Sequence, residues 1–431
     1  MRLGAPVFFA AFFLPFAAAR SLSVKLLDAT YTGYHNSTSG LDVWLGVSWD
    51  HNGAYQFDPT PLINLSGNKF VAVVLQYRLG AFGFLSGSDS ISQSNGLNAA
   101  ITDARFALQF VQSNIGKFGG SKDDVTIWGQ SSGGGTVLEL LAQEGRLQET
   151  NGSKYRKLFR AAIMNSPWFP PLGKCSDTYF KARPVPAAPS STLRQLNYQM
   201  NKAQQGHVNY WTACLEDNPS ESGYLKIHPV QAMRSGIVAG ATGSNSADGS
   251  APSNLSTPAL FQNFLRTNWP LTAEQISKVS ELYPESAFTD SHARGVSVYQ
   301  DAVFACGSTW ATAAFTERKG SWRYLFGILP AVHAQDNAYE FPIWYNYRSP
   351  VSPSVFAAFG GSIANFTVGR NPNSKALNNT WAQSSSGNQI VFNMTSPANI
   401  SETYITDFYA PLSGTKERCD FWADVRLTGG W

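Results

Sequence analysis

The sequence predicts an α/β fold with a mainly parallel sheet, because strand-like and helix-like segments alternate in its N-terminal part. The segment "KFVAVVLQYRLGAFGF" (69–84) opens as a buried strand and ends in a loop with several glycines. "GLNAAITDARFALQFVQSNIGKFGG" (96–120) has apolar residues at helical spacing and stops at glycines. A further strand-like run (125–128) precedes another helical pattern. In such a sheet the carboxyl ends of the strands meet at one edge, where we expect the functional site.

The turn between that last strand and helix, in "DDVTIWGQSSGGGTVLELL" (123–141), has the Gly-x-Ser-x-Gly pattern of a nucleophile elbow. Gly129 and Gly133 flank Ser131 at minus two and plus two, whereas Ser132 lacks the first glycine. Glycines remove the Cβ atoms that would clash in so sharp a turn, which leaves the serine at its apex. Ser131 is therefore the candidate nucleophile, and the backbone N–H of Ser132 is a candidate oxyanion donor. The alternative is a glycine-rich loop with incidental serines.

Composition argues against several classes of protein. The chain has 431 residues, of which 43% are hydrophobic, so it can bury a large core. A net charge of +3 without a long basic run gives no reason to propose nucleic acid or an anionic membrane as a partner. The cysteines are far apart and the six histidines are scattered, so we expect neither a metal site nor a cofactor.

The N-terminal stretch "MRLGAPVFFAAFFLPFAAARS" has the features of a secretory signal. An early arginine precedes an apolar core from Ala5 to Ala19, which is too short to span a membrane. We expect cleavage near Ala19 or Arg20, so that residues 1–19 form the signal and residues 20–431 form one α/β domain. No later stretch reaches membrane-spanning length, and the expected location is extracellular.

Other features of the chain suit a secreted glycoprotein. Four cysteines in an oxidising compartment suggest two disulfides, with three possible pairings. Asn-x-Ser/Thr triplets are N-glycosylation acceptors, although such triplets also occur by chance. Eight of them are present, at Asn36, Asn64, Asn151, Asn254, Asn365, Asn378, Asn393 and Asn399.

A series of motifs stands in the order found in a known family. The motifs are "LDVWLGVSW", "YRLGAFGFLS", "VTIWGQSSGGG", "GSNSADG", "YQDAVFACGS", "LPAVHAQDNAYEF" and "ERCDFW". From about Leu22 to its end the chain resembles the type-B carboxylesterase/lipase family, the cholinesterase-like branch of the α/β-hydrolases, and fungal secreted members above all. The resemblance implies an α/β-hydrolase fold and a secreted serine hydrolase that cleaves small-molecule or lipid esters of carboxylic acids.

A serine hydroxyl becomes a good nucleophile when a base takes its proton, so a histidine is needed. The chain order of this fold is serine, acid, histidine, which excludes His35 and His51. His333 matches the family's catalytic histidine, although Ala334 replaces the glycine that usually follows it. A surface histidine in a polar loop is the alternative. The other histidines that follow the elbow are expected to face solvent: His207, His228 and His292.

The third member of the triad is a carboxylate that holds the imidazole in the right tautomer. The resemblance implies Asp248, in "GSNSADGS", where the family usually carries glutamate followed by glycine. Aspartate is one methylene shorter, so its loop would have to lie closer to His333. Asp301 is the weaker alternative, because its apolar surroundings suggest a structural role. Asp336 is expected to shape the loop of His333.

The family's oxyanion loop reads His-Gly-Gly-Gly, and "HNGAYQF" stands in its place here. The resemblance implies that Gly53 and Ala54 donate backbone N–H groups to the oxyanion beside Ser132. Asn52 replaces a glycine, although asparagine tolerates left-handed backbone angles better than most residues. A polar surface turn is the alternative.

A long segment with sheet strands separates "LGVSW" from the oxyanion loop in the family, whereas here Asp50 is followed directly by His51. Either "DVWLGVSW" has taken over as the strand that feeds the loop, or the chain lacks sheet strands and leaves an unpaired edge. Two functions therefore remain open. One is the serine hydrolase, and the other is a non-catalytic cholinesterase-like binding or adhesion module, or a truncated and impaired relative.

The resemblance also implies how the cysteines pair, namely Cys175 with Cys214 and Cys306 with Cys419. In addition, "NSPWFPPLG" suggests an apolar acyl site through Trp168 and Phe169. Ordinary aromatic packing of these two side chains is the alternative.

Overall fold

The computed structural model places most of the chain. It describes residues 7–12, 22–26, 29–44, 58–86, 91, 96–170, 172–176, 212–216, 223–234, 241–245, 255–269, 271–316, 320–342, 352–384, 389–396, 399–405 and 415–428. The loop expected to hold Gly53 and Ala54, and the loop of Asp248, lie outside these ranges.

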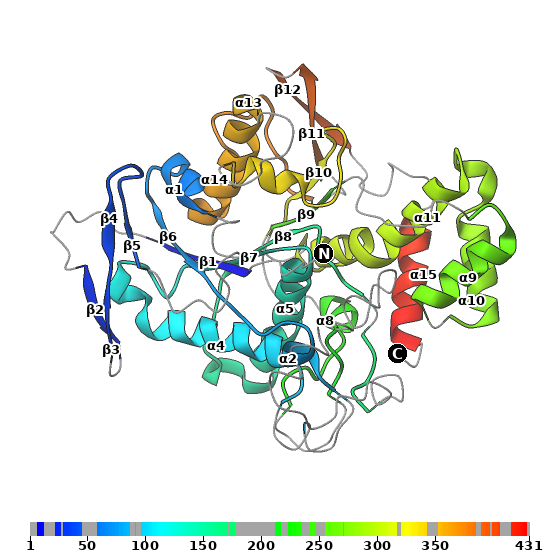
Figure 1. The fold of residues 1–431 in the computed structure, drawn as a ribbon, viewed down its shortest axis with the longest axis horizontal. Coiled ribbons are helices and arrows are strands. Elements are labelled where there is room, and N and C mark those ends of the chain that lie inside the picture. The colour runs from blue at the N-terminus through cyan, green and yellow to red at the C-terminus, as the bar shows by residue number, and fades with distance from the viewer. Residues whose placement is uncertain are drawn as a thin grey trace.

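The centre of the fold is an eight-stranded sheet with the order β12-β11-β10-β9-β8-β7-β1-β6 (Figure 1). From β7 through β11 neighbouring strands are parallel, and β12 adds an antiparallel edge. The bounds of these strands are β1 (Val7–Phe12), β6 (Phe70–Val74), β7 (Val125–Gln130), β8 (Ala161–Asn165), β9 (Ala241–Asn245), β10 (Arg323–Phe326), β11 (Gln389–Ser396) and β12 (Asn399–Ile405).

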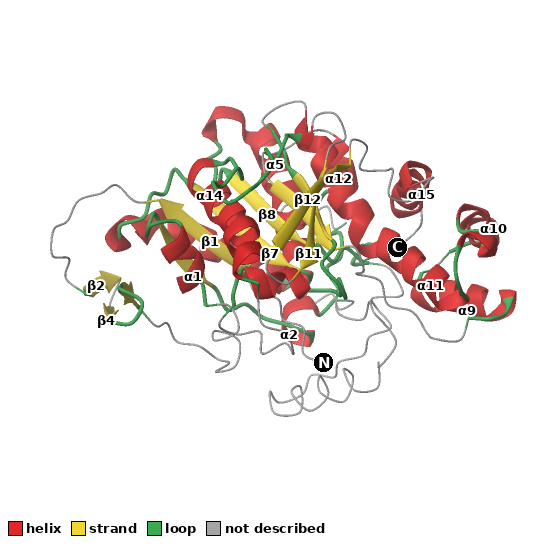
Figure 2. Cartoon of the chain, turned by 90° about the horizontal axis from the view of Figure 1, so that it is seen from above, coloured by secondary structure: helices red, strands yellow, loops and turns green. Residues whose placement is uncertain are grey.

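Helices cover both faces of this sheet, as Figure 2 shows. Side chains alternate along each strand, so Ala162 and Met164 of β8 join one apolar cluster while Ala161 and Ile163 join the other. The first cluster includes residues of α4, α5, α8 and α12, and the second includes residues of α1 and α14. The helices are α1 (Thr60–Leu65), α2 (Ala81–Phe84), α4 (Ala99–Asn114), α5 (Ser132–Asn151), α8 (Pro229–Arg234), α9 (Pro258–Asn268), α10 (Ala273–Leu282), α11 (Ser291–Gln300), α12 (Cys306–Thr316), α13 (Pro353–Val355), α14 (Gly361–Gly369) and α15 (Thr415–Thr428).

The elements predicted around the elbow are present. The first predicted strand is β6, and the helix predicted over 96–120 is α4 followed by a 3₁₀ turn, Ile115–Phe118. β7 continues to Gln130, two residues beyond the predicted run, and α5 begins at Ser132. Every residue of β7 is buried, as expected for a parallel strand with helices on both faces.

An N-terminal strand occupies the sheet position beside β7. β1 is antiparallel to both its neighbours, with Phe9 opposite Val73 on one side and Ile127 on the other. These six residues belong to the segment expected to be a secretory signal. Because β1 pairs with β7 along this side, the unpaired edge expected for a chain without the family's strands does not occur there.

The stretch "DVWLGVSW" does not enter the central sheet in its described part. β5 (Leu41–Val43) pairs with β4 (Tyr34–Asn36) in a separate two-stranded sheet. A second small sheet joins β2 (Ser23–Leu26) to β3 (Ala29–Thr32). The expectation that this stretch replaces the missing strand is therefore not met by its first residues, and the remainder lies outside the described ranges.

Both cysteine pairs form disulfides, in the pairing that the resemblance implies. Cys306 at the start of α12 is joined to Cys419 in α15, across 113 positions. This bridge lies in an apolar cluster that includes side chains of α9, α10, α11 and α15. Cys175 is joined to Cys214, across 39 positions, beside the buried side chain of Asn98, which hydrogen-bonds to the backbone of Cys214.

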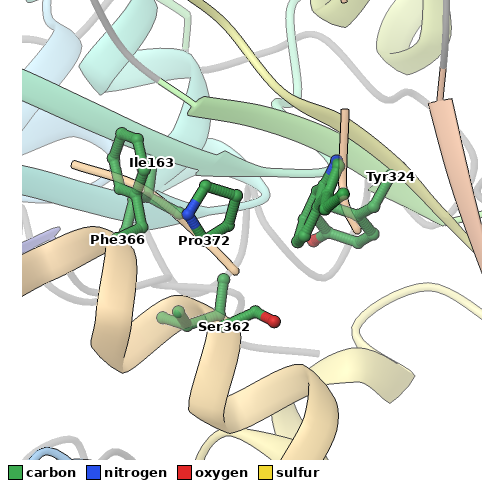
Figure 3. A pocket seen from close by; sticks show the side chains of 7 residues that line it. Ile163, Tyr324, Ser362, Phe366 and Pro372 are labelled. Atoms are coloured by element: carbon green, nitrogen blue, oxygen red, sulfur yellow. The ribbon is translucent and has the colours of Figure 1, made fainter. Parts of the chain in front are cut away.

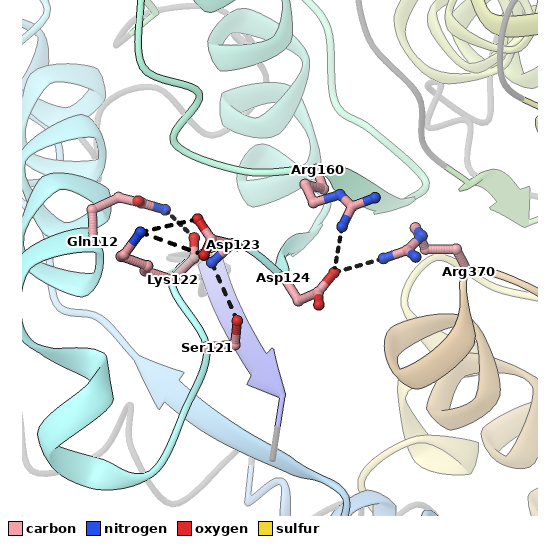
Figure 4. Close-up of polar contacts among 7 residues, drawn as sticks. All are labelled: Gln112, Ser121, Lys122, Asp123, Asp124, Arg160 and Arg370. Carbon is pink, nitrogen blue, oxygen red and sulfur yellow. Dashed lines mark hydrogen bonds and ion pairs between the residues drawn. The ribbon is translucent and has the colours of Figure 1, made fainter. Parts of the chain in front are cut away.

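A charged contact ties the elements together at the opposite end of β7 from the elbow (Figure 4). Asp124, just before β7, accepts hydrogen bonds from Arg160 at 2.9 Å and from Arg370 at 2.7 Å. Arg160 precedes β8 and Arg370 follows α14. Since all three side chains are partly exposed, this contact adds little to stability but fixes the relative position of the three elements.

Five of the predicted glycosylation acceptors are exposed: Asn64, Asn151, Asn365, Asn378 and Asn393. Asn36 is half-buried, and its side chain accepts hydrogen bonds from the backbone of Thr38 and Ser39. Asn254 and the side chain of Asn399 lie outside the description. Within the ranges that the structure covers, no helix has the length and apolar character needed to cross a membrane.

Candidate active site

Ser131 lies at the sharp turn between β7 and α5. Its backbone angles, φ 56° and ψ −122°, belong to a region that residues other than glycine rarely adopt. The N–H of Ser131 donates to the carbonyl of Asn165 at 2.9 Å. The carbonyl of Ser131 accepts the N–H groups of Gly135 and Trp168, at 3.0 and 2.8 Å. These bonds hold the strained backbone that presents the predicted nucleophile.

The glycines of the motif allow close approach of backbones at this turn. A Cβ on Gly129 would collide with the carbonyl of Gly133, where the chain folds back on itself. A Cβ on Gly135 would collide with the carbonyl of Trp168 in the segment after β8. The Gly-x-Ser-x-Gly pattern therefore has the steric cause that the sequence suggests, and the same steric limit applies two residues further along the chain, at Gly135.

His333 reaches the nucleophile from the loop that follows β10. Its Nε2 lies 2.8 Å from Oγ of Ser131, which is hydrogen-bond distance for a nucleophile and its base. The two residues are 202 positions apart in the chain. Ser131 and His333 are the serine and histidine that the resemblance implies, and the structure brings them into contact.

Ala334, which replaces the usual glycine, adopts a left-handed conformation with φ 67° and ψ 11°. Only glycine adopts such angles without a steric cost from Cβ, which explains why glycine is usual here. The chain tolerates alanine because the short helix that follows, Gln335–Tyr339, is anchored by buried side chains. Among them, Asp336 accepts a hydrogen bond from the hydroxyl of Tyr324 at 2.7 Å, so it shapes this loop.

Asp301, the weaker candidate for the acid, bonds to Arg418 and Tyr283. Its carboxylate accepts hydrogen bonds from Arg418 at 2.7 Å and from the hydroxyl of Tyr283 at 2.9 Å. Asp301 and Arg418 are almost fully buried, and they join the chain before α12 to α15. This ion pair has the structural role expected for Asp301. Asp248, the preferred candidate, is outside the described residues.

Ser132 is the first residue of α5, so its backbone N–H has no acceptor within the helix. It is therefore available to a developing oxyanion at the positive end of the helix. The side chain of Ser132 is hydrogen-bonded to Tyr77, from the loop after β6. The other two proposed donors, Gly53 and Ala54, lie outside the description.

Two neighbours of His333 were not identified from the sequence. The amide nitrogen of Gln130 lies 3.4 Å from Nε2 of His333. The ring of Phe304 lies 4.8 Å from the imidazole, centre to centre. Phe304 belongs to a one-turn π-helix, Asp301–Ala305, a type of distortion often found at functional sites. The signal for Gln130 was its position next to the nucleophile, whereas nothing in the sequence pointed to Phe304.

The two aromatic residues suggested for an acyl site differ in their surroundings. Trp168 is half-buried, and its backbone contacts Ser131. Phe169 is buried among Trp310, His228 and Arg426, so it belongs to the core. His228 is itself 5% exposed, which corrects the expectation that it faces solvent. Burial, followed by the charge of Arg426, lowers the pKa of His228 to about 3.

A small apolar cavity lies on the other side of β8, lined by Ile163, Tyr324, Ser362, Ile363, Phe366, Pro372 and Trp381 (Figure 3). Its volume is about 10 Å³, at the lower limit for one water molecule, and Ser131 and His333 are not among its lining residues. It is a packing defect rather than a substrate site. The part of the chain that the structure describes contains no cluster of side chains suited to hold a metal ion.

The sequence matches known proteins over part of its length. Residues 45–183 match the model of the carboxylesterase family. "Secreted lipase 1" of Botryotinia fuckeliana is 36% identical over 127 residues, which are 28% of this chain and 21% of the relative. "Secreted lipase 4" of Gibberella zeae is 26% identical over 385 residues, which are 76% of this chain and 66% of the relative. The chain therefore spans less than two thirds of the length of either relative.

The fold matches solved structures over most of the chain. The crystal structure of EstA from Aspergillus niger has a TM-score of 0.70 at 20% identity, covering 90% of this chain and 80% of that one. A pNB esterase has a TM-score of 0.65 at 20% identity, covering 86% and 79%. The predicted α/β-hydrolase fold is confirmed, and the chain carries carboxylesterase-family sequence over residues 45–183.

Proposed function

We propose that this protein is a secreted serine hydrolase that cleaves carboxylic esters. His333 Nε2 takes the hydroxyl proton of Ser131 as Oγ attacks the ester carbonyl carbon. The alcohol leaves with that proton, and the acyl group remains on Ser131. Water, deprotonated by His333, then attacks the acyl carbon and releases the acid. The carboxylate of Asp248 orients the imidazole.

The observation that carries this proposal is the 2.8 Å contact between Ser131 Oγ and His333 Nε2 on a strained elbow. The oxyanion of each tetrahedral intermediate would accept the N–H of Ser132, together with those of Gly53 and Ala54. A non-catalytic module needs no contact between a nucleophile and its base, so the geometry favours the enzyme. The names of the fungal relatives, "Secreted lipase", support both the ester substrate and secretion.

Covalent labelling tests the nucleophile. A fluorophosphonate should modify the purified protein at Ser131, located by mass spectrometry of the peptide. Ser131→Ala should abolish labelling. Ser132→Ala should retain most of it, because the proposed contribution of residue 132 is a backbone N–H that alanine keeps. A folded wild-type chain that remains unlabelled would favour the non-catalytic module.

The acid is tested by a pair of aspartate variants. Asp248→Asn should lower turnover of a p-nitrophenyl ester by about 10⁴-fold, the loss seen when a triad loses its control of the tautomer. Asp301→Asn should mainly destabilise the fold, by about 3–5 kcal/mol, because it leaves Arg418 buried without its partner. The assignment is wrong if folded Asp301→Asn is inactive while Asp248→Asn hydrolyses normally.

Acyl length separates the two substrate classes. A series of p-nitrophenyl esters from acetate to palmitate, measured below and above the solubility limit, distinguishes a small-molecule ester from a lipid. Activity that falls steadily with chain length indicates an esterase, and activity that rises at the lipid interface indicates a lipase.

A further inference from the structure

A single buried residue, Asn165, joins the backbone of the nucleophile to the segment that follows the histidine. Asn165, at the end of β8, accepts the backbone N–H of Ser131 at 2.9 Å. Its side-chain nitrogen, Nδ2, donates to Oε1 of Glu340 at 2.6 Å. Glu340 lies at the end of the short helix that begins two residues after His333. Asn165 therefore joins the backbone of the elbow to the segment that carries the histidine.

The residues around the hydrogen bond between Asn165 and Glu340 fix its direction and shield it from water. Oδ1 of Asn165 accepts the indole N–H of Trp128 at 3.3 Å, which orients the amide so that Nδ2 faces Glu340. Asn165 and Glu340 are both 0% exposed, so water does not compete for the bond. The Trp128 ring is stacked on Phe341, the neighbour of Glu340 in the chain. The pair is therefore held from both sides.

Burial disfavours the charged form of Glu340. Burial, and then the charge of Asp336, raise the pKa of Glu340 well above its usual value. Its second oxygen, Oε2, has no hydrogen-bond partner among the described residues. A buried glutamic acid with one bond to an amide serves no obvious purpose in packing, since an apolar residue would fill the same space at a lower cost.

We propose that Asn165 and Glu340 are positioning residues that keep His333 in register with Ser131. This proposal rests on the proposed function, because it assigns the two residues a role in the same reaction. The bond between them sets how far the end of β8, and with it Ser131, lies from the histidine loop. Misplacement of a catalytic group by about 1 Å can cost about 10²-fold in rate, so loss of the bond should slow acylation.

The variants follow from the direction of the bond. Asn165→Asp keeps the acceptor for Trp128 but replaces the uncharged amide donor by a second buried carboxyl group, and the two carboxyl groups repel each other when both are ionised. Glu340→Leu removes the acceptor. Both should lower kcat for p-nitrophenyl acetate, and the rate of fluorophosphonate labelling, by about 10- to 100-fold with little change in KM. Glu340→Gln keeps an acceptor and should retain most of the activity.

The exchanged pair is the decisive variant. In Asn165→Asp combined with Glu340→Gln, the new glutamine donates to the new aspartate, so the bond is restored in the opposite direction. We expect this double variant to recover most of the activity lost in Asn165→Asp. Recovery distinguishes positioning from a general loss of stability, which two substitutions would make worse.

A matched control comes from α14, whose residues Ile363 and Phe366 belong to the same apolar cluster as Trp128 and Phe341. Ser362 is 0% exposed and donates to the carbonyl of Ala358, so Ser362→Ala loses one buried hydrogen bond away from the site. It should lower Tm slightly and leave kcat unchanged.

The proposal is overturned if Asn165→Asp is folded and labels at the wild-type rate, or if the exchanged pair is folded but as slow as Asn165→Asp. If Asn165→Asp does not fold, recovery of folding and activity by the exchanged pair supports the proposal, and its failure overturns it. Failure of the proposed function gives a different result, since even the wild-type protein would then remain unlabelled.

Discussion

The amide nitrogen of Gln130 lies 3.4 Å from Nε2 of His333. This is the same ring nitrogen that contacts Oγ of Ser131. The side chain of Gln130 is 7% exposed, so it is held in place beside the imidazole. A primary amide has a donor and an acceptor, and it can present either one by rotation. It therefore suits both the neutral imidazole and the imidazolium that forms when Ser131 loses its proton.

A carboxylate at this position would favour only the imidazolium. In Gln130→Glu the acid limb of the pH profile of kcat/KM should move upward by about one pH unit, because an adjacent negative charge holds the proton on the histidine. Gln130→Met, which fills a similar volume without charge, should leave the limb in place. A series of rate measurements from pH 4 to 9 checks this, and an unchanged limb in Gln130→Glu contradicts it.

Ala334→Gly should stabilise the protein by about 0.5–1 kcal/mol. Alanine at φ 67° has a steric cost that glycine lacks, and this exceeds the entropy that glycine adds to the unfolded chain. Ala338→Gly, in the helical turn that follows, is the matched control and should destabilise by about 1 kcal/mol. Urea denaturation measures both. A loss of stability in Ala334→Gly would show that its backbone angles are not strained.

Glu139→Gln should stabilise the protein increasingly as pH rises. Burial raises the pKa of Glu139 from its usual 4.5 to about 8, so the folded state holds a proton that the unfolded state releases. The stability from this group is complete below pH 4.5 and is lost as the pH rises through 8. Glutamine has no such loss, and the gain should reach about 3 kcal/mol at pH 7 as an upper limit.

The control for Glu139 is on the same helix. Glu149 is exposed near the end of α5, so Glu149→Gln makes the same substitution at a solvated position. Urea denaturation of the two variants at pH 5, 6, 7 and 8 compares them with the wild type. A gain in Glu139→Gln that does not vary with pH would show that the buried carboxyl does not hold its proton.

His228 should make the protein less stable as the pH falls, whereas Glu139 makes it less stable as the pH rises. Its pKa of about 3 lies below the usual 6.5, so the unfolded state takes up a proton that the folded state refuses. Its contribution is complete above pH 6.5 and is lost as the pH falls toward 3, by about 1.4 kcal/mol for each unit. His228→Asn keeps an acceptor for the N–H of Val230, which Nδ1 accepts at 3.2 Å. This variant should lose less stability in acid than the wild type.

His292→Asn, which replaces a histidine at an exposed position, supplies the comparison. Free energies of unfolding between pH 4 and 7 provide the measurement. Equal slopes for the wild type and His228→Asn would mean that His228 is protonated in the folded protein.

The two disulfides should differ in what they contribute. Replacing Cys306 and Cys419 by alanine should cost about 4–5 kcal/mol, because the bridge closes a loop across 113 positions. The bridge of Cys175 and Cys214 spans 39 positions, and its loss should cost about 1 kcal/mol less by the same entropy argument. Chemical denaturation of the two double variants tests the order, and a larger loss for the shorter loop would contradict it.

The sequence was most informative where the cause of a feature is local. The elbow could be identified because a strand, two glycines, a serine and a helix are neighbours in the chain, and steric clashes explain why they must be. The position of His333 required the resemblance, since its contact with Ser131 spans 202 positions. The left-handed angles of Ala334 could not be seen from alanine itself.

Contacts between distant buried polar groups were beyond the sequence. The bond between Asn165 and Glu340 spans 175 positions, and although each residue lies in a recognised motif, nothing in those motifs indicates that the two side chains meet. The burial of His228 was missed for a similar reason, because its neighbours Phe169 and Arg426 come from remote segments. A polar residue type favours the surface on average, and only the fold determines the exceptions.

The place of β1 in the sheet makes the order of events during synthesis important. Val7–Phe12 leaves the ribosome before β6 and β7, yet it can pair with them only after both have been made. If residues 1–19 are a signal that is cleaved, as the sequence predicts, cleavage in that interval takes away a strand before its partners exist. Processing and folding then compete for the same segment, and the faster one decides which sheet forms. Early cleavage leaves parallel β6 and β7 separated by an empty position, and late cleavage finds its substrate already paired on both sides.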